Sequence, residues 1–216
     1  MKDKEEKIEP ELSEAVAYLE KMLANVEKKS KKHYNRGLKG LHDKAYDLAI
    51  NEFTKAIELC PENAMAYDSR GRAYGEKGEY DQSIADFSVA IRMDNTFAGY
   101  YNNRGVSYYK QSMFDKAIID YNRAIELKPD VAMFYSNRAL AYYHRDEYAQ
   151  ALADFSTALM LDPNDTEAYS YRGEVYAALG MTDKAVADFK AALALNPTDI
   201  ITYGNLTWLS EKRMIS

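Results

Sequence analysis

The 216-residue sequence has one cysteine, one tryptophan and three histidines. The single cysteine, Cys60, excludes an internal disulfide, cannot complete a thiolate cluster around a metal, and is compatible with a reducing compartment. The histidines His33, His42 and His144 have no spacing that suggests a shared metal site. The sequence therefore predicts no cofactor and no metal, nominates no catalytic residues, and favours a protein that is not an enzyme.

Long apolar runs are also missing, and no segment approaches the roughly 20 apolar residues of a membrane-spanning helix. The first ten residues, MKDKEEKIEP, lack the apolar centre of a signal peptide. The net charge of −6 argues against nucleic acid or an anionic membrane as the partner. We therefore expect a cytoplasmic protein with no nucleic-acid or membrane partner.

What the sequence does contain is a 34-residue repeat. The segment from Ala98 to Val131, AGYYNNRGVSYYKQSMFDKAIIDYNRAIELKPDV, recurs in altered form as AMFYSNRALAYYHRDEYAQALADFSTALMLDPND. The same register fits the segments before and after this pair. A fixed period of this length is the signature of a repeat architecture. It divides the chain into five units, 30–63, 64–97, 98–131, 132–165 and 166–199.

The units share residue types at fixed positions, counted from the first residue of each unit. Positions 4 and 11 are mostly tyrosine, positions 20 and 27 are small, and proline closes four of the units. Position 8 is small and position 24 is aromatic. Spacings of three and four place these residues in one stripe on each of two helices, where small residues let the helices approach closely. Position 8 is Gly37, Gly71, Gly105, Ala139 and Gly173, and position 24 is Phe53, Phe87, Tyr121, Phe155 and Phe189.

This pattern resembles the tetratricopeptide repeat (TPR) family over residues 30–199. The resemblance implies an all-α fold, a right-handed α-solenoid in which each unit is a pair of antiparallel helices. It also implies a non-catalytic scaffold for protein–protein interaction, with a concave groove that holds peptides.

Two charged rows run with the same period. Position 7 is arginine in every unit, and position 23 is an acid in every unit. Because every arginine has its acid in the same unit, we favour a ladder of ion pairs between the two helices, bidentate where the geometry allows. The alternative is an arginine row that binds an anion or a peptide. The rows are Arg36, Arg70, Arg104, Arg138 and Arg172, and Glu52, Asp86, Asp120, Asp154 and Asp188.

The two ends of the chain depart from the repeat. In residues 1–29 we expect a disordered start to about residue 10 and then an amphipathic helix whose apolar stripe docks onto the first repeat, with the groove or another chain as alternatives. Its basic run, 28–32, is a solvated junction or a contact patch. Residues 200–216 repeat only a first helix and predict a C-terminal capping helix. Trp208 is expected to pack at or partly cover its edge, and an exposed Trp208 would indicate a further contact surface. The N-terminal stripe is Leu12, Val16, Leu19, Leu23 and Val26.

The resemblance places a second stripe of each first helix, positions 2, 5, 6, 9 and 13 with position 12 at its border, in the concave groove. These positions differ from unit to unit, whereas the packing positions nearly match. Asparagine at position 6 can pair with the backbone of an extended peptide, although it can also serve as a solvated or capping residue. The predicted peptide-binding groove is lined by Met65, Arg72, Asn102, Asn103, Val106, Tyr109, Met133, Asn137, Leu140 and Tyr143.

The carboxylate clamp by which some TPR proteins bind chaperone tails is not complete in this sequence. It would require lysine at position 5 and arginine at position 6, and neither occurs at those positions. We therefore expect a scaffold that binds a different protein or peptide partner in the groove. The alternative is a self-assembling TPR module that forms a homo-oligomer through its N-terminal helix or its solenoid ends.

Overall fold

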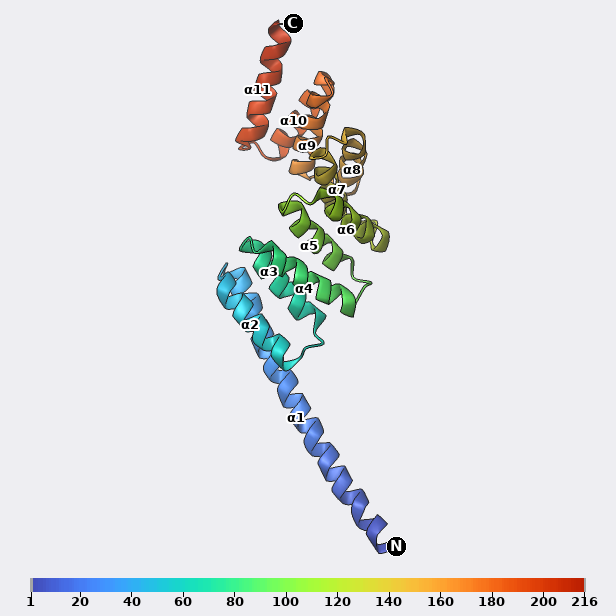
Figure 1. The fold of residues 1–216 in the computed structure, drawn as a ribbon. Coiled ribbons are helices and arrows are strands. Elements are labelled where there is room, and N and C mark those ends of the chain that lie inside the picture. Colours follow the sequence, from blue (N-terminus) through green and yellow to red (C-terminus); the bar gives the residue numbers. More distant parts are fainter. Residues whose placement is uncertain (1, 216) are drawn as a thin grey trace. The chain divides into compact units, whose positions relative to one another are not determined.

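In the computed structural model the backbone is described for residues 2–215 and the side chains for residues 13–209. Every regular element of the described backbone is a helix, which confirms the predicted all-α solenoid (Figure 1). The helices are α1 (Lys2–His42), α2 (Tyr46–Leu59), α3 (Ala64–Glu76), α4 (Tyr80–Met93), α5 (Ala98–Lys110), α6 (Phe114–Leu127), α7 (Ala132–Tyr143), α8 (Tyr148–Leu161), α9 (Thr166–Ala178), α10 (Thr182–Leu195) and α11 (Ile200–Ile215).

The chain forms two compact units, Met1–Asn95 and Thr96–Ser216. In the first unit α1 pairs with α2 and α3 with α4, and α2 also packs on α3. In the second unit the pairs are α5 with α6, α7 with α8, and α9 with α10, while α11 packs on α10 and α9. Helices α3, α5, α7 and α9 begin at residues 64, 98, 132 and 166, the first residues of four of the predicted repeats.

Within each pair, the core is an aromatic ring seated on a small residue. Tyr121 of α6 is 1% exposed, and a Cβ placed on Gly105 of α5 would lie 2.7 Å from its ring. The same contact recurs at Gly173 and Phe189. The predicted pairing of positions 8 and 24 is therefore correct, and it explains why a larger residue at position 8 would force the two helices apart.

The turn between the two helices of each repeat uses a left-handed residue at position 15. This residue is glycine in two repeats, with φ of +80° at Gly78 and +71° at Gly180. In the other three repeats it is Lys44, Ser112 or Asp146, with φ between 56° and 59°. A left-handed conformation costs a non-glycine residue about 1 kcal/mol, so these three turns carry local strain.

The ladder of arginine and acid is present in four of the five repeats. Arg70, Arg104, Arg138 and Arg172 each hold their aspartate with two parallel hydrogen bonds of 2.7–2.8 Å. Each guanidinium also lies over the two tyrosines at positions 4 and 11 of its own helix, 5.6–5.9 Å from the ring centroids. The structural interpretation of the arginine row is therefore correct for these repeats.

The first repeat departs from the predicted ladder. Its acid, Glu52, accepts a hydrogen bond of 2.8 Å from His33 and is also paired with Lys55 at 3.2 Å. Arg36 is exposed. The prediction that every arginine pairs with the acid of its own unit is thus wrong for Arg36, because His33 replaces the tyrosine of position 4 and takes the carboxylate.

The N-terminal segment also differs from the prediction. Helix α1 runs without a break from Lys2 into the first repeat, in place of a disordered start and a separate helix (Figure 1). Most of its stripe does not dock onto the first repeat: Val16, Leu19 and Leu23 are 47%, 63% and 61% exposed, whereas Val26 is half-buried. A continuous helix projects its N-terminal part away from its own repeat and cannot fold back onto it. Leu12 lies outside the residues whose side chains are described.

The C-terminal helix α11 packs on the fifth repeat as a capping helix is expected to do. Leu209 is buried, with 4% of its surface exposed, and it belongs to a cluster with Ala185 and Phe189 of α10. Trp208, however, is 51% exposed. The indole thus covers the edge of the repeat only in part, and its exposed half leaves a surface for a further contact.

Candidate functional site

The second unit presents a face of its first helices that its second helices cover only in part, since side chains on this face also pack against core clusters that include residues of α6 and α8. We call this face the open stripe, and its described side chains are half-buried or exposed. It arises because positions 4, 8 and 11 turn toward the partner helix, so that positions 6, 9 and 12 lie on another side of the same helix. The open stripe consists of Asn103, Val106 and Tyr109 on α5, Asn137, Leu140 and Tyr143 on α7, Tyr171 and Glu174 on α9, and Trp208 on α11.

Aromatic rings from three successive repeats touch one another along the open stripe. The ring of His144, which directly follows α7, lies 5.5 Å from Tyr109 and 5.4 Å from Tyr143. Tyr143 in turn lies 6.1 Å from Tyr171 of α9. Phe114 of α6 stacks on His144 at 5.3 Å. The result is a continuous aromatic surface, which can receive apolar or cationic side chains of a ligand.

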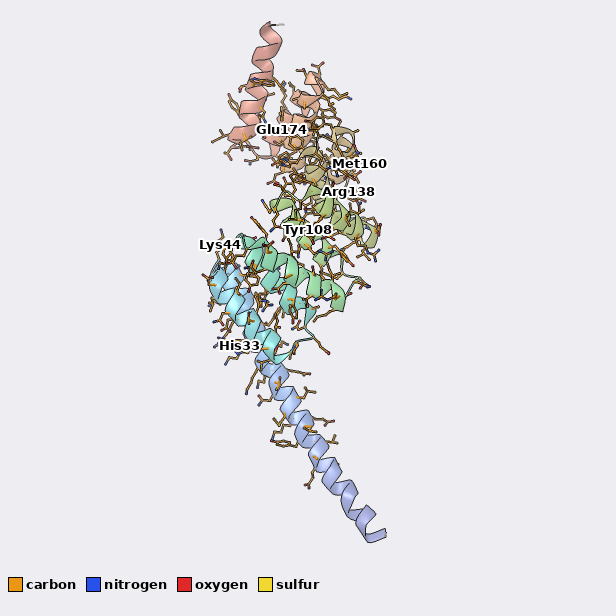
Figure 2. The ribbon with its side chains drawn as sticks, viewed as in Figure 1. His33, Lys44, Tyr108, Arg138, Met160 and Glu174 are labelled. Atoms are coloured by element: carbon orange, nitrogen blue, oxygen red, sulfur yellow. The ribbon has the colours of Figure 1, made fainter. Side chains whose placement is uncertain are left out.

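At the α9 end of the stripe a carboxylate is fixed by its neighbours. Glu174 accepts a hydrogen bond of 3.1 Å from the hydroxyl of Tyr143 and another of 3.1 Å from the amide of Asn205 (Figure 2 labels Glu174). Burial and the charge of Glu174 raise the pKa of Tyr143 to about 12. Burial, Glu174 and Glu167 raise the pKa of Tyr171, so both carboxylates act on this one ring.

The asparagines of the predicted groove have two different roles. Asn102 is only 3% exposed, and its side-chain oxygen accepts a hydrogen bond of 2.9 Å from the amide of Asn137. This bond joins α5 to α7. Asn102 therefore holds adjacent repeats together and does not present an open groove surface, contrary to the prediction. Asn103 and Asn137 remain half-buried on the open stripe.

The other predicted residues divide between the two units. In the second unit Val106, Tyr109, Leu140 and Tyr143 are half-buried along the open stripe, and Met133 is 53% exposed at the start of α7. Met65 and Arg72 belong to the first unit, where both are exposed on α3. The eight predicted residues of the second unit thus lie on two neighbouring helices, α5 and α7.

Sequence reasoning missed the α9 and α11 part of the stripe. Tyr171 interrupts the asparagine row, and Trp208 was assigned to the edge of the capping helix and not to the groove. A signal was available, because Trp208 follows Glu174 by 34 residues and so takes the same position as Val106 and Leu140. Extending the repeat register into the C-terminal half repeat would have found it.

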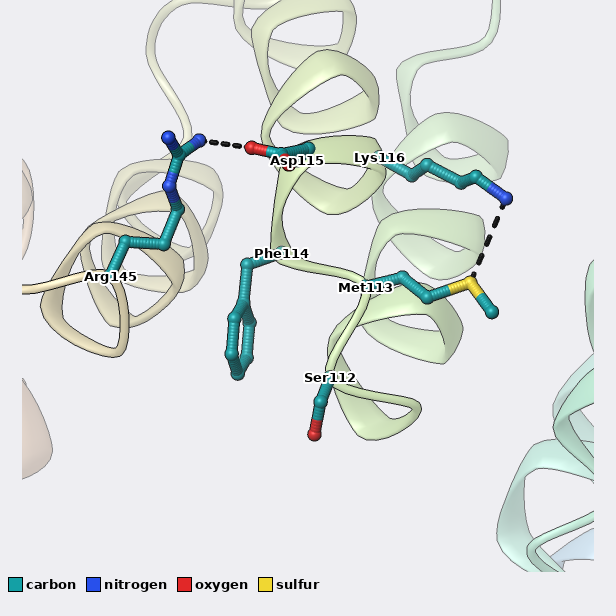
Figure 3. A pocket seen from close by; sticks show the side chains of 6 residues that line it. All are labelled: Ser112, Met113, Phe114, Asp115, Lys116 and Arg145. Atoms are coloured by element: carbon teal, nitrogen blue, oxygen red, sulfur yellow. Dashed lines mark hydrogen bonds and ion pairs between the residues drawn. The ribbon is translucent and has the colours of Figure 1, made fainter.

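A shallow depression of about 380 Å³ lies beside the turn between α5 and α6 (Figure 3). Phe114 and Met113 form its apolar part, and Arg145 crosses from the following repeat to form an ion pair with Asp115. Lys116 donates to the sulfur of Met113 at 3.7 Å. Arg145 and Asp115 neutralise each other and Lys116 also lies over the Tyr108 ring, so the open stripe is the better candidate for binding.

In the first unit, basic side chains gather on one side of α1. They surround a depression of about 680 Å³ together with two asparagines. Ser30, Gly37 and Gly40 of the same helix are buried, so the basic residues occupy the side turned away from α2. The lining residues are Asn25, Lys28, Lys29, Lys31, Lys32, Asn35, Arg36 and Lys39.

No helix in the part of the chain that the structure describes is long and apolar enough to cross a membrane. Over the same described residues, no group of three or more histidine, cysteine or acidic side chains could hold a metal ion. The cytoplasmic location stays a prediction.

Paired helices, a 34-residue period and a partly exposed face on the first helices define a helical repeat solenoid. Three family models of the tetratricopeptide repeat match the sequence, one at residues 98–131 and 166–199, a second at 71–112 and 140–180, and a third at 52–85. The chain belongs to the tetratricopeptide repeat family. This fold is that of a protein–protein interaction scaffold.

Solved structures of TPR proteins have the same fold. A crystal structure of MamA is 25% identical, covers 79% of this chain and 93% of its own, and has a TM-score of 0.69. PilF of Pseudomonas aeruginosa is 18% identical with a TM-score of 0.77, over 88% of this chain and 87% of its own, and shows the fold alone. The first TPR domain of Spaghetti (RPAP3), bound to the HSP90 peptide SRMEEVD, is 30% identical over 56% of this chain and 96% of its own, with a TM-score of 0.54. No curated protein sequence matches the chain.

Proposed function

We propose that the chain is a non-catalytic scaffold that binds an extended peptide segment of a partner protein along the open stripe of its second unit. The observation that carries this proposal is the contact of aromatic rings from α5 to α9, on a face whose described side chains remain half-buried or exposed. A face built from several repeats suits an extended ligand, because each repeat adds one set of contacts along the chain of the peptide.

The chemistry of the stripe supports a ligand with apolar side chains. Val106 and Leu140 occupy the same position in adjacent repeats, and each has an aromatic residue three positions later, Tyr109 and Tyr143. Burying one such apolar side chain of a ligand contributes about 1.5–3 kcal/mol before the entropic cost of binding. Asn103 and Asn137 lie on the same face; both are also hydrogen-bonded to Asn102, and the side-chain oxygen of Asn137 can accept from the peptide backbone.

An acidic peptide such as SRMEEVD, which the similar RPAP3 domain binds, does not fit this stripe. The sequence lacks the lysine and arginine of the carboxylate clamp. Instead, the α9 end carries the carboxylates of Glu167 and Glu174, which would repel an acidic tail. The partner we propose is therefore of a different kind.

The test is selection of dodecapeptides from a random displayed library on the full chain, followed by affinity measurements with synthetic copies. Replacing Leu140 by Glu inserts a charge into the stripe and should weaken the selected peptides at least about tenfold, because an apolar contact becomes a buried charge. Met160→Glu is the matched control, because Met160 is 76% exposed on α8, a second helix (Figure 2). Peptides that bind both variants equally would show that the stripe is not the binding site.

Self-association through α1 is a second candidate function. Val16, Leu19 and Leu23 are largely exposed and follow one another at spacings of three and four, as apolar residues do in paired helices. Replacing Leu19 and Leu23 by lysine should reduce the mass measured by light scattering. Lysines at Ala17 and Ala24, on the opposite side of the helix, are the control; an unchanged mass in the Leu19 and Leu23 variant would exclude this interface.

A further inference from the structure

The open stripe is not chemically uniform along its length. Its α5 and α7 part is neutral and apolar, with Val106 and Leu140, whereas at the same position α9 has Glu174. Two turns earlier on α9, at position 2, Glu167 replaces the methionine of the preceding repeat. The α9 part of the proposed peptide site is thus anionic, whereas the α5 and α7 part is not.

Within the residues whose side chains the structure describes, the two carboxylates of α9 have no cationic partner in an ion pair. Among the described side chains of the second unit, no lysine or arginine forms an ion pair with Glu167 or Glu174, although the arginines of the ladder are all paired with aspartates. The hydrogen bonds that Glu174 accepts come from neutral groups, the Tyr143 hydroxyl and the Asn205 amide. These bonds fix the carboxylate in place without neutralising its charge.

The surroundings of the carboxylates are aromatic. Tyr171 lies between Glu167 and Glu174 in the α9 sequence, touches the ring of Tyr143 at 6.1 Å, and stacks on Phe155 at 6.2 Å. Trp208 takes the position of Glu174 one repeat further on, on α11, and is 51% exposed. A cation is attracted both by carboxylates and by the faces of aromatic rings, and the second attraction strengthens when water is displaced.

We propose that the α9 end of the open stripe binds a lysine or arginine side chain of the partner peptide, beside the Tyr171 ring and the carboxylates of Glu167 and Glu174. This proposal rests on the proposed function and adds the chemistry of the ligand to it. The apolar residues of the peptide lie along α5 and α7, and its cationic residue reaches α9. The partner segment is therefore an extended peptide that combines apolar side chains with at least one positive charge.

The experiment compares peptides selected on the full wild-type chain with peptides selected on the Glu167→Gln/Glu174→Gln double variant. We expect lysine or arginine to be enriched at one position of the wild-type peptides and this enrichment to be lost with the variant. A wild-type peptide should bind the variant about tenfold more weakly. Its affinity for the wild type should also fall as potassium chloride is raised, because salt screens exposed charges.

Two controls separate charge from fold. Glu126→Gln with Asp130→Asn removes the same two charges from exposed positions in and after α6, and should leave the affinity unchanged. Glu167→Gln alone alters an exposed side chain in the first turn of α9. It should show part of the affinity loss of the double variant, and its melting temperature should stay that of the wild type.

The outcomes distinguish this inference from the proposed function. Selected peptides that depend on Leu140 but show no enrichment of lysine or arginine would leave the peptide groove standing and overturn the cationic site. Peptides that bind Leu140→Glu as tightly as the wild type would overturn the groove itself. If the Glu126/Asp130 control lost as much affinity as the Glu167/Glu174 variant, the net charge of the protein, and not the α9 carboxylates, would attract the peptide.

Discussion

The guanidinium of Arg138 on α7 holds the carboxylate of Asp154 on α8 through two hydrogen bonds of 2.7 Å. Its remaining nitrogen donates to the side-chain oxygen of Asn122 on α6, also at 2.7 Å. One side chain thus joins both helices of its own repeat to the second helix of the preceding repeat. The ladder of such residues stabilises the stacking of repeats as well as the pairing of helices.

Replacing Asp154 by Ala should lower the free energy of unfolding by about 2–4 kcal/mol. The reason is that Asp154 is 6% exposed and its removal leaves the largely buried charge of Arg138 without its partner. Urea unfolding followed by circular dichroism measures the change. Binding of selected peptides at a temperature where the variant is folded should stay as in the wild type.

Glu126→Ala is the matched control for this prediction. It removes the acid of an exposed pair with Arg123, 3.0 Å apart, and exposed pairs contribute less than about 1 kcal/mol. If Asp154→Ala and Glu126→Ala lowered the free energy of unfolding equally, an ion pair of the ladder would stabilise the fold no more than a surface ion pair does.

The ladder and the helix register could be predicted from the sequence because they depend on spacing within one repeat. Arg138 and Asp154 are 16 residues apart, and the same interval recurs in every unit. The exception, Arg36, occurs where His33 replaces a tyrosine and competes for Glu52. Such competition depends on how far each side chain reaches in the folded structure, and an alignment of the repeats does not give this information.

The site was less predictable, because it depends on how one repeat packs on the next. Asn102 and Asn137 are 35 residues apart and lie on different helices. The spacing within one helix does not indicate that the Asn137 amide donates a hydrogen bond to the buried side-chain oxygen of Asn102. The continuity of α1 was also missed. On either side of the repeat boundary between Lys29 and Ser30 there is neither proline nor glycine to end a helix. The helix therefore continues across the boundary.

The pairing of Glu52 with His33 predicts a pH dependence of stability. The hydrogen bond from His33, followed by the contribution of Lys55, lowers the pKa of Glu52, although burial opposes this effect. A carboxyl group whose pKa is lower in the folded state contributes stability above its unfolded pKa, and this contribution is lost as the pH falls through the folded pKa. Between about pH 5 and pH 3, stability should therefore fall less steeply in Glu52→Gln than in the wild type.

Urea unfolding at a series of pH values measures this difference, and His33→Ala supplies its control. Without the histidine the pKa of Glu52 should move back toward its ordinary value, so that the variant loses part of the slope. Identical slopes in the wild type, Glu52→Gln and His33→Ala would mean that the pairing does not stabilise the folded state.

The left-handed turns predict a substitution that stabilises the protein. Ser112 has a φ of 59°, a conformation that glycine adopts without steric cost, so Ser112→Gly should raise the free energy of unfolding by about 0.5–1 kcal/mol. Gly78 is the converse, with a φ of +80° and open space where a Cβ would lie, so Gly78→Ala should destabilise by a similar amount through the backbone alone. Opposite shifts in melting temperature would confirm the account, and shifts of the same sign would contradict it.

The close contact of Gly105 with Tyr121 predicts the cost of overfilling a helix pair. A Cβ at Gly105 would meet the tyrosine ring at 2.7 Å, so Gly105→Ala should destabilise the second unit by about 1–3 kcal/mol. The fourth repeat already has an alanine at this position, Ala139, opposite the fully buried Phe155. The helices of a pair can therefore adjust to one methyl group, which places the expected cost at the lower end of the range. Gly105→Leu, measured by the same urea unfolding, should cost distinctly more than Gly105→Ala, and equal stability of both variants would show that position 8 does not set the separation of the two helices.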